Sequence, residues 1–178
     1  MRQERCVVLI DGSNFYFKLK NLELHNLLSL DLSGFLHSLI DGNELVSATY
    51  YVGAVKTDGT AKTQTLFNNQ RKLLAHLRKH QVRYSLGYLL KSDGVFHEKG
   101  VDVKLAVDML VATYEDQCDR ILLVSSDTDL LPAIKKAQEK GKKVEYVGFS
   151  HKPSVALVKN CDETTLLKKE DVARFIQS

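Results

Sequence analysis

Four aspartates in this chain stand where a parallel α/β sheet would bring them to one edge. Asp11 follows an apolar run and Asp102 stands at the start of a helical segment. Asp127 and Asp129 follow a second apolar run. Carboxylates that meet in one crevice repel one another unless cations neutralise them. If these four meet, the crevice would hold a divalent metal ion.

The residue types favour a hard metal ion and phosphodiester chemistry. No Cys or His stands beside the four aspartates. Carboxylate ligands suit Mg²⁺ or Mn²⁺, which bind through carboxylates and substrate phosphate. One or two such ions would activate a water for attack on phosphorus and neutralise the departing oxygen. We therefore expect all four aspartates to be metal ligands and catalytic residues. Since the six histidines lie outside these segments, a metal-free histidine ribonuclease is disfavoured.

Polar side chains near the aspartates are candidates for binding the substrate. Lys99 suits a phosphate contact, because a point-charge ammonium tolerates varied geometry, although a solvated surface lysine would look the same. Hydroxyl and amide groups could donate to phosphate or fix the carboxylates. The predicted substrate-binding residues are Ser13, Asn14, Lys99, Ser126 and Thr128.

The aspartates also have a simpler interpretation as helix caps. Asp-Gly-Ser-Asn at 11–14 and Ser-Ser-Asp-Thr-Asp at 125–129 contain residue types that favour turns and helix starts. Asp102 could likewise cap its helix. Three independent caps would not be expected to project from the same sheet edge, so these interpretations weaken together. Asp108 lies about 9 Å further along the helix of Asp102, so we expect it not to share the ion and to be a buried structural acid or a group that supports the ligands.

The elements that would position these residues alternate between strand and helix. The expected strands are 6–10, 45–55, 82–90, 120–125 and 143–148. The expected helices are 15–22, 33–40, 60–80, 100–114 and 129–140. This alternation predicts an α/β fold with a parallel five-stranded sheet and helices on both faces. Ligands in such sheets bind outside the carboxyl ends of the strands.

Finer expectations concern the middle and the end of the chain. The tyrosines of the strand at 82–90 are expected in the core rather than as platforms for bases. The helix at 100–114 is apolar nearly all round, so it is expected to be buried. Ser-Asp-Gly at 92–94 predicts a turn. The last elements expected on the sheet edge are a short helix near 154–159, an extended piece near 164–167 and a C-terminal helix within 168–178.

The composition of the 178 residues indicates a single domain over 1–178. No apolar stretch approaches the roughly 18 residues that span a bilayer, and no signal-peptide pattern opens the chain. We therefore expect a cytoplasmic protein without membrane contact. The net charge of the chain is +3. Residues 56–104 carry 10 basic and 4 acidic side chains, so the positive excess lies in this region. Such a region suits a polyanionic substrate, although a solvated helix face would give the same count.

Three segments resemble the motifs of the NYN domain, the LabA-like bacterial branch of the PIN-like nuclease superfamily. They are Val-Leu-Ile-Asp-Gly-Ser-Asn at 8–14, Lys-Gly-Val-Asp-Val at 99–103 and Val-Ser-Ser-Asp-Thr-Asp-Leu at 124–130. The resemblance covers about residues 5–167. It implies a PIN-like Rossmannoid three-layer fold with strand order 3-2-1-4-5 and a ribonuclease that depends on Mg²⁺ or Mn²⁺.

The resemblance also implies roles for residues and a partner. The family's acidic positions correspond to Asp11, Asp102, Asp127 and Asp129. Its polar residue in the first motif corresponds to Asn14, which would orient Asp11 or the attacking water. Many relatives have Gly where Ser126 stands. The implied partner is RNA, and the sequence leaves open single-stranded DNA, endonucleolytic or exonucleolytic cleavage, and a homodimer.

Three other functions would require different features of the sequence or share only part of this pattern. A nucleotide-dependent dehydrogenase or kinase would need a Gly-rich phosphate loop after the first strand, which this chain lacks. An adhesion-type metal site would need a second hydroxyl where Phe15 stands. A catalytically weak or silent RNA-binding or regulatory domain of the same fold stays open, although retention of all four acids favours cleavage.

Overall fold

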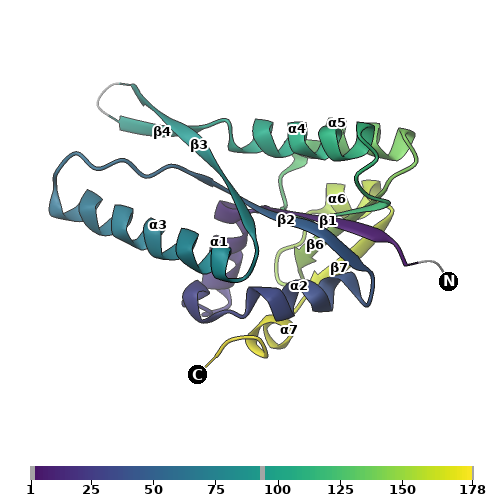
Figure 1. Cartoon of the computed structure of the whole chain (residues 1–178), viewed down its shortest axis with the longest axis horizontal. Helices are drawn as coiled ribbons and strands as arrows, with labels where there is room; N and C mark the ends of the chain where they lie inside the picture. The colour runs from purple at the N-terminus through teal and green to yellow at the C-terminus, as the bar shows by residue number, and fades with distance from the viewer. Residues whose placement is uncertain (1–2, 93–94, 178) are drawn as a thin grey trace.

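The computed structural model describes residues 3–92 and 95–177, which form a seven-stranded sheet with helices on both faces (Figure 1). The strand order across the sheet is β4-β3-β2-β1-β5-β6-β7. The strands are β1 (Arg5–Asp11), β2 (Glu44–Gly53), β3 (Arg83–Ser92), β4 (Val95–Lys99), β5 (Arg120–Val124), β6 (Lys143–Phe149) and β7 (Glu163–Leu167). Because β1 pairs in parallel with both β2 and β5, Asp11 ends a central strand.

The helices connect these strands and cover the sheet. No helix among the described residues is long and apolar enough to span a membrane. The α-helices are α1 (Gly12–Asn21), α2 (Leu32–Ile40), α3 (Ala61–Lys79), α4 (Val101–Tyr114), α5 (Leu131–Glu139), α6 (Val155–Asn160) and α7 (Lys169–Ala173). Two 3-10 helices, η1 (Leu27–Ser29) and η2 (Thr128–Leu130), precede α2 and α5.

The predicted strand order is confirmed, but the count of five was too low. The five expected strands are β1, β2, β3, β5 and β6, and they lie in the order 3-2-1-4-5. A sixth parallel strand, β7, pairs with β6, and β4 adds an antiparallel strand to β3. The extended piece expected near 164–167 is β7, which was not counted as a strand of the sheet, whereas β4 was not expected. Both have five residues, and neither has the apolar run of a central strand. Asp93 and Gly94 of the predicted turn lie outside the described residues.

Two apolar clusters fill the spaces above and below the sheet. On β1, Cys6, Val8 and Ile10 enter the cluster beneath α1, α2 and α3, whereas Val7 and Leu9 enter the cluster beneath α4 and α5. Figure 1 shows these two groups of helices on opposite faces. Alternate side chains of a strand point to opposite faces, so both must be apolar here. The central strands are thus fixed from both sides, and so is their carboxyl edge.

The helix α4 is not buried all round, contrary to the prediction. It packs Val101, Leu105 and Met109 against the sheet. Val103 and Val107, on another side of the helix, are 62% and 46% exposed. Nothing within the described ranges 3–92 and 95–177 forms a further layer over these valines. An apolar sequence therefore gives this helix an exposed apolar side beside the sheet edge.

The C-terminal helix is shorter than the predicted span 168–178. α7 ends at Ala173, and Ile176 then forms an antiparallel bridge with Leu30. The N–H of Gln177 donates to the carbonyl of Ser29 at 2.8 Å. Backbone pairing with the segment before α2 thus replaces the last turns of helix.

Gly12 allows α1 to begin close against β2. A Cβ at this position would lie 2.2 Å from Cε1 of Tyr50 and 2.6 Å from the carbonyl oxygen of Tyr51. The buried hydroxyl of Tyr50 donates to the carbonyl of Gly12 at 3.0 Å. Close backbone approach therefore requires Gly after Asp11, and it fixes where Asp11 leaves the sheet.

Candidate active site

The carboxyl ends of β1 and β5 border a hollow of about 470 Å³, which we call the acidic hollow. Asp11 ends β1, Asp102 lies in the first turn of α4, and Asp127 follows β5. Three segments that are distant in sequence thus meet at the edge where the sequence predicted a ligand site. The lining residues are Asp11, Ser13, Asn14, Phe17, Val101, Asp102, Leu105, Asp127 and Leu130.

Asp102, Asp127 and Asp129 form a carboxylate cluster that could hold a metal ion. One oxygen from each residue lies within 4.8 Å of the other two. Ligands on opposite sides of Mg²⁺ are about 4.2 Å apart, so small side-chain movements would close the cluster around an ion. The carboxylates of Asp102 and Asp129 have no hydrogen bond or ion pair with any residue in the described ranges. No cationic side chain of the described residues therefore neutralises the cluster.

Asp127 combines two interpretations that the sequence left open. Its Oδ1 accepts the N–H of Asp129 at 2.9 Å and so caps η2. Its second oxygen is left for a ligand. Asp102 is not a cap, because the N-cap of α4 is Gly100, whose φ is 81°. The positive end of the helix dipole favours a carboxylate in the first turn, where Asp102 lies.

Asp11 lies in the acidic hollow but outside the carboxylate cluster. Its Oδ1 accepts the Asn14 N–H and its Oδ2 accepts the Ser125 hydroxyl, both at 3.0 Å. Burial raises the pKa of Asp11, and the charges of Asp127 and Asp102 act in the same direction against the two hydrogen bonds. Three of the four predicted aspartates could thus bind one ion together, and hydrogen bonds hold the fourth, Asp11, beside them.

Ser125 is a residue of the site that sequence reasoning did not select. It is 2% exposed, and its hydroxyl accepts the Asp127 N–H at 3.1 Å while donating to Asp11. Ser125 therefore joins the end of β1 to the loop after β5. Strand register was the signal that could have found it, because Ile10 pairs with Val124 and so places Asp11 beside Ser125.

Only some of the predicted substrate-binding residues line the acidic hollow. Ser13 and Asn14 line the acidic hollow. Ser126 does not line it, and its hydroxyl lies 3.1 Å from the hydroxyl of Tyr146. Thr128 is exposed at the start of η2 and is also absent from the lining. The structure therefore brings two of these four residues to the aspartates.

Lys99 stands beside the acidic hollow rather than inside it. It is exposed at the end of β4 and lines a second hollow of about 600 Å³, which we call the edge hollow. Asp102 lines both hollows and lies between them. Lys99 has no ion pair with any described residue, so its charge is available to a ligand. The side chain of His97, two residues earlier, lies outside the described part of the chain.

Asp108 is held by other protein groups. It accepts a hydrogen bond from the Tyr51 hydroxyl at 2.9 Å and pairs with Lys104. These contacts agree with the prediction of an acid that does not share the ion, although Asp108 is half-buried rather than buried.

Phe17 is a second residue that sequence reasoning did not select. Its side chain lines the acidic hollow and is 59% exposed. It packs edge-to-face on Tyr16 with ring centroids 5.5 Å apart. Tyr16 and Phe17 therefore form an exposed aromatic pair beside the acidic hollow.

Asp102→Asn is expected to stabilise the metal-free protein and remove its response to metal. The substitution removes repulsion from two nearby carboxylates without breaking a hydrogen bond, and this gain should exceed the lost interaction with the helix dipole. The melting temperature in EDTA should therefore rise by about 2 °C. Mn²⁺ should raise the melting temperature of the wild type, because a ligand that binds the folded state stabilises it. Differential scanning fluorimetry in EDTA and in Mn²⁺ measures both effects. An undiminished Mn²⁺ shift in the variant would remove Asp102 from the site.

The six parallel strands, their order and the carboxylates at their edge define an α/β domain of Rossmann-like class. Over residues 5–168 the chain matches the family model described as the NYN domain, so it belongs to the NYN domain family. This family is part of the PIN-like nuclease superfamily, which suggests a ribonuclease. The family predicted from the three motifs is confirmed.

Two similar proteins are themselves without an assigned function. A segment of 70 residues, 39% of this chain, is 40% identical to an uncharacterized protein of Methanocaldococcus jannaschii. The match spans 29% of the length of that relative. A crystal structure of a protein of unknown function from Vibrio parahaemolyticus superimposes with a TM-score of 0.72 and 23% identity. It covers 97% of this chain and 99% of its own, and it supports the fold alone.

Proposed function

We propose that this protein is a metal-dependent ribonuclease that hydrolyses phosphodiester bonds of RNA with Mg²⁺ or Mn²⁺ held in the acidic hollow. The main supporting observation is the cluster of Asp102, Asp127 and Asp129, which no cationic side chain of the described residues neutralises. Its donors are carboxylate oxygens, which suit these hard cations. A bound divalent cation would supply an activated water and neutralise the departing oxygen.

Asp11 would act beside this cluster, either as a further ligand or as a proton acceptor. The Asn14 N–H and the Ser125 hydroxyl fix the orientation of its carboxylate. Because burial raises its pKa, Asp11 would hold a proton more readily than an ordinary aspartate. Ser125 would be a positioning residue, since it acts through Asp11 and Asp127.

Protein groups near the aspartates would bind the phosphates of RNA. Ser13 and Asn14 line the acidic hollow and could donate to the scissile phosphate. Lys99 is exposed on the far side of Asp102, where it could bind a neighbouring phosphate. Ser126 would contribute through its contact with Tyr146 rather than by touching substrate.

The test is cleavage of a single-stranded RNA labelled at its 5′ end, followed over time on a denaturing gel. We expect products in Mn²⁺ or Mg²⁺ and none in EDTA, because the carboxylate cluster would bind only a metal-bridged phosphate. Cleavage that continues in EDTA would contradict a metal-dependent mechanism. A parallel single-stranded DNA of the same sequence tests the choice of RNA.

A domain that binds RNA without cutting it is the alternative outcome of this test. It would bind the labelled RNA but give no products with either metal ion. The acidic hollow and the basic side chains near it would then bind RNA without cleaving it.

A further inference from the structure

We propose that single-stranded RNA leaves the acidic hollow along a groove between α4 and β3, with a base stacked on Tyr88 and a phosphate bound by Arg83. This inference rests on the proposed function. It gives the path of the substrate and two residues that would bind the substrate along this path. Neither residue belongs to the motifs with the aspartates.

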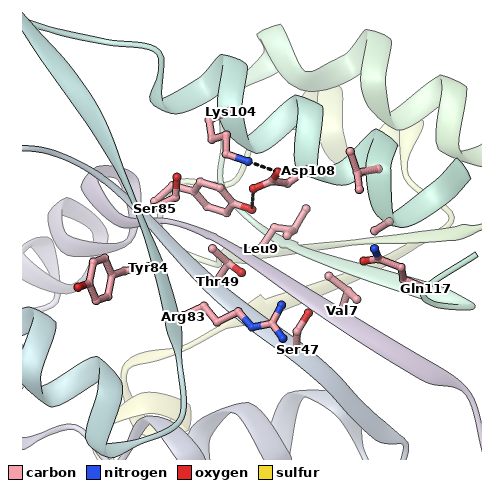
Figure 2. A pocket seen from close by; sticks show the side chains of 13 residues that line it. Val7, Leu9, Ser47, Thr49, Arg83, Tyr84, Ser85, Lys104, Asp108 and Gln117 are labelled. Atoms are coloured by element: carbon pink, nitrogen blue, oxygen red, sulfur yellow. Dashed lines mark hydrogen bonds and ion pairs between the residues drawn. The ribbon is translucent and has the colours of Figure 1, made fainter. Parts of the chain in front are cut away.

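Three hollows follow one another along α4, and adjoining hollows share lining residues. Asp102 lines both the acidic hollow and the edge hollow. Ser85 and Lys104 line both the edge hollow and a third hollow of about 350 Å³. We call this third one the sheet-face groove, and it lies between α4 and the exposed surface of β2 and β3 (Figure 2). An extended ligand on this face of α4 would pass the edge hollow between the carboxylates and Arg83.

The edge hollow offers an apolar surface for a base. Tyr88 is 58% exposed there, although the sequence predicted a core tyrosine. Leu86, Val103 and Val107 line the same hollow and are also exposed. An aromatic ring with apolar neighbours stacks an unpaired base regardless of its identity. Bases in a duplex are already stacked and paired, so this surface favours a single strand.

The sheet-face groove offers a cation and hydroxyl groups for a phosphate. Arg83 extends from β3 across β2 towards Ser47 (Figure 2) and pairs in register with Thr49. Arg83 is exposed and has no ion pair or hydrogen bond with the residues in the described ranges. Lys104 is already paired with Asp108, so Arg83 provides the available positive charge of the groove. An unpaired guanidinium beside hydroxyls is a common phosphate-binding arrangement.

The length of the path fits a short stretch of RNA. Asp102 and Val111 of α4 border opposite ends of the path and are nine residues apart, which is about 14 Å along a helix. A strand with stacked bases rises about 3.4 Å per nucleotide, and a strand whose base stacks on protein is more extended, so this length holds at most about four nucleotides. Oligonucleotides of two nucleotides should therefore miss contacts that longer RNA makes.

The test is fluorescence anisotropy of labelled, unstructured RNA of two and ten nucleotides in EDTA, where no cleavage is expected. Arg83→Gln should weaken binding of the ten-nucleotide RNA about fivefold and reduce the slope of log affinity against log salt by about 0.7, since one phosphate contact is lost. Tyr88→Leu should weaken it about tenfold without changing the slope, because stacking is not ionic. The two-nucleotide RNA should bind the wild type more weakly than the ten-nucleotide RNA does, because it is too short to reach Tyr88 and Arg83 together.

Lys159→Gln is the matched control. Lys159 is an exposed cation without an ion pair to any described residue, and it lies on α6 near the opposite edge of the sheet. This variant should bind as the wild type does. The proposed path is overturned if the wild type does not bind the ten-nucleotide RNA, or if Arg83→Gln and Tyr88→Leu bind it as tightly as Lys159→Gln.

Cleavage measured on the same proteins separates the two proposals. If the wild type cleaves the ten-nucleotide RNA in Mn²⁺, Arg83→Gln should raise KM about fivefold. Cleavage with an unchanged KM in both variants would support the proposed ribonuclease activity and contradict the proposed RNA path. If RNA binding depends on Arg83 and Tyr88 but no cleavage occurs, the result would support the RNA path and contradict the ribonuclease activity.

Discussion

Asp127→Asn is expected to lower the rate of RNA cleavage in Mn²⁺ by about a thousandfold or more. A metal ion contributes several kcal/mol of charge stabilisation to phosphodiester hydrolysis, and this variant removes a ligand from the three-carboxylate cluster. The amide oxygen of Asn can still accept the Asp129 N–H that Asp127 accepts at 2.9 Å, so the loop should keep its shape. Initial rates on a labelled single-stranded RNA measure the effect.

Asp41→Asn is the matched control for this experiment. Asp41 is exposed, and Asn tolerates its left-handed backbone, with φ 45° and ψ 57°. Its removal changes net charge by the same amount as Asp127→Asn, at the far end of the central strands. We expect its cleavage rate to stay within about twofold of the wild type. If Asp127→Asn cleaves as fast as this control, the nuclease activity does not come from the acidic hollow.

Arg120→Met is expected to destabilise the protein by about 3 kcal/mol. Arg120 donates to Glu145 at 2.9 Å and to Glu4 at 2.8 Å, and the side chain of Glu145 is only 7% exposed. Removing the guanidinium leaves a buried carboxylate whose one remaining side-chain donor among the described residues is the hydroxyl of Thr165, at 2.7 Å. Urea denaturation of both proteins at pH 7 measures the difference. Equal midpoints would mean that the ion pair adds nothing to stability.

Lys143→Met is the matched control, because it removes a more exposed cation from the same group of charges. The side chain of Lys143 is 51% exposed and its amino group lies 2.9 Å from Glu4. Surface ion pairs of this kind contribute about 0–1 kcal/mol, so the control should unfold nearly as the wild type does. A control that loses as much stability as Arg120→Met would show that burial of Glu145 is not the cause.

The stability of this group should also depend on pH in a defined direction. The hydrogen bond from Lys143, together with the charge of Arg120, holds the pKa of Glu4 below its usual 4.5. A carboxyl group whose pKa is lowered by folding increases the free energy of unfolding at pH values above its unfolded-state pKa. This contribution is lost as the pH falls through its folded-state pKa. The gap between wild type and Arg120→Met should therefore narrow below about pH 4.5. A gap that widens in acid would contradict this assignment.

The sequence predicted the position of the site because strand ends determine it. Asp11 and Asp127 follow the apolar runs of β1 and β5, and adjacent parallel strands end at the same edge. The place of Asp102 followed from its helix. These are consequences of chain order, so they do not depend on side-chain orientation.

Side-chain orientation was the part that residue type could not predict. Ser125 and Ser126 are identical in chemistry, yet one hydroxyl binds Asp11 and the other contacts Tyr146. Asp11 and Asp127 are both caps, but only Asp127 belongs to the three-carboxylate cluster. Which neighbours each oxygen meets depends on distances of a few tenths of an ångström, and these arise from packing.

Exposure near the edge of the sheet was also hidden from the sequence. Tyr88 and Val107 belong to apolar patterns that are typical of core elements, and both are exposed. Burial depends on whether another layer covers an element, and a pattern within one element carries no information about its neighbours. The same limit concealed the groove between α4 and β3.

The most direct test of the metal site is a crystal of the protein soaked in Mn²⁺, with anomalous diffraction data. We expect a peak within roughly 2.5 Å of oxygens from Asp102, Asp127 and Asp129, since carboxylates bind such ions at this range. Asp11 within the same distance of a peak would make it a ligand, and a peak without it would favour its role as a proton acceptor. Mn²⁺ bound elsewhere on the protein, with no peak among these three carboxylates, would contradict the proposed site.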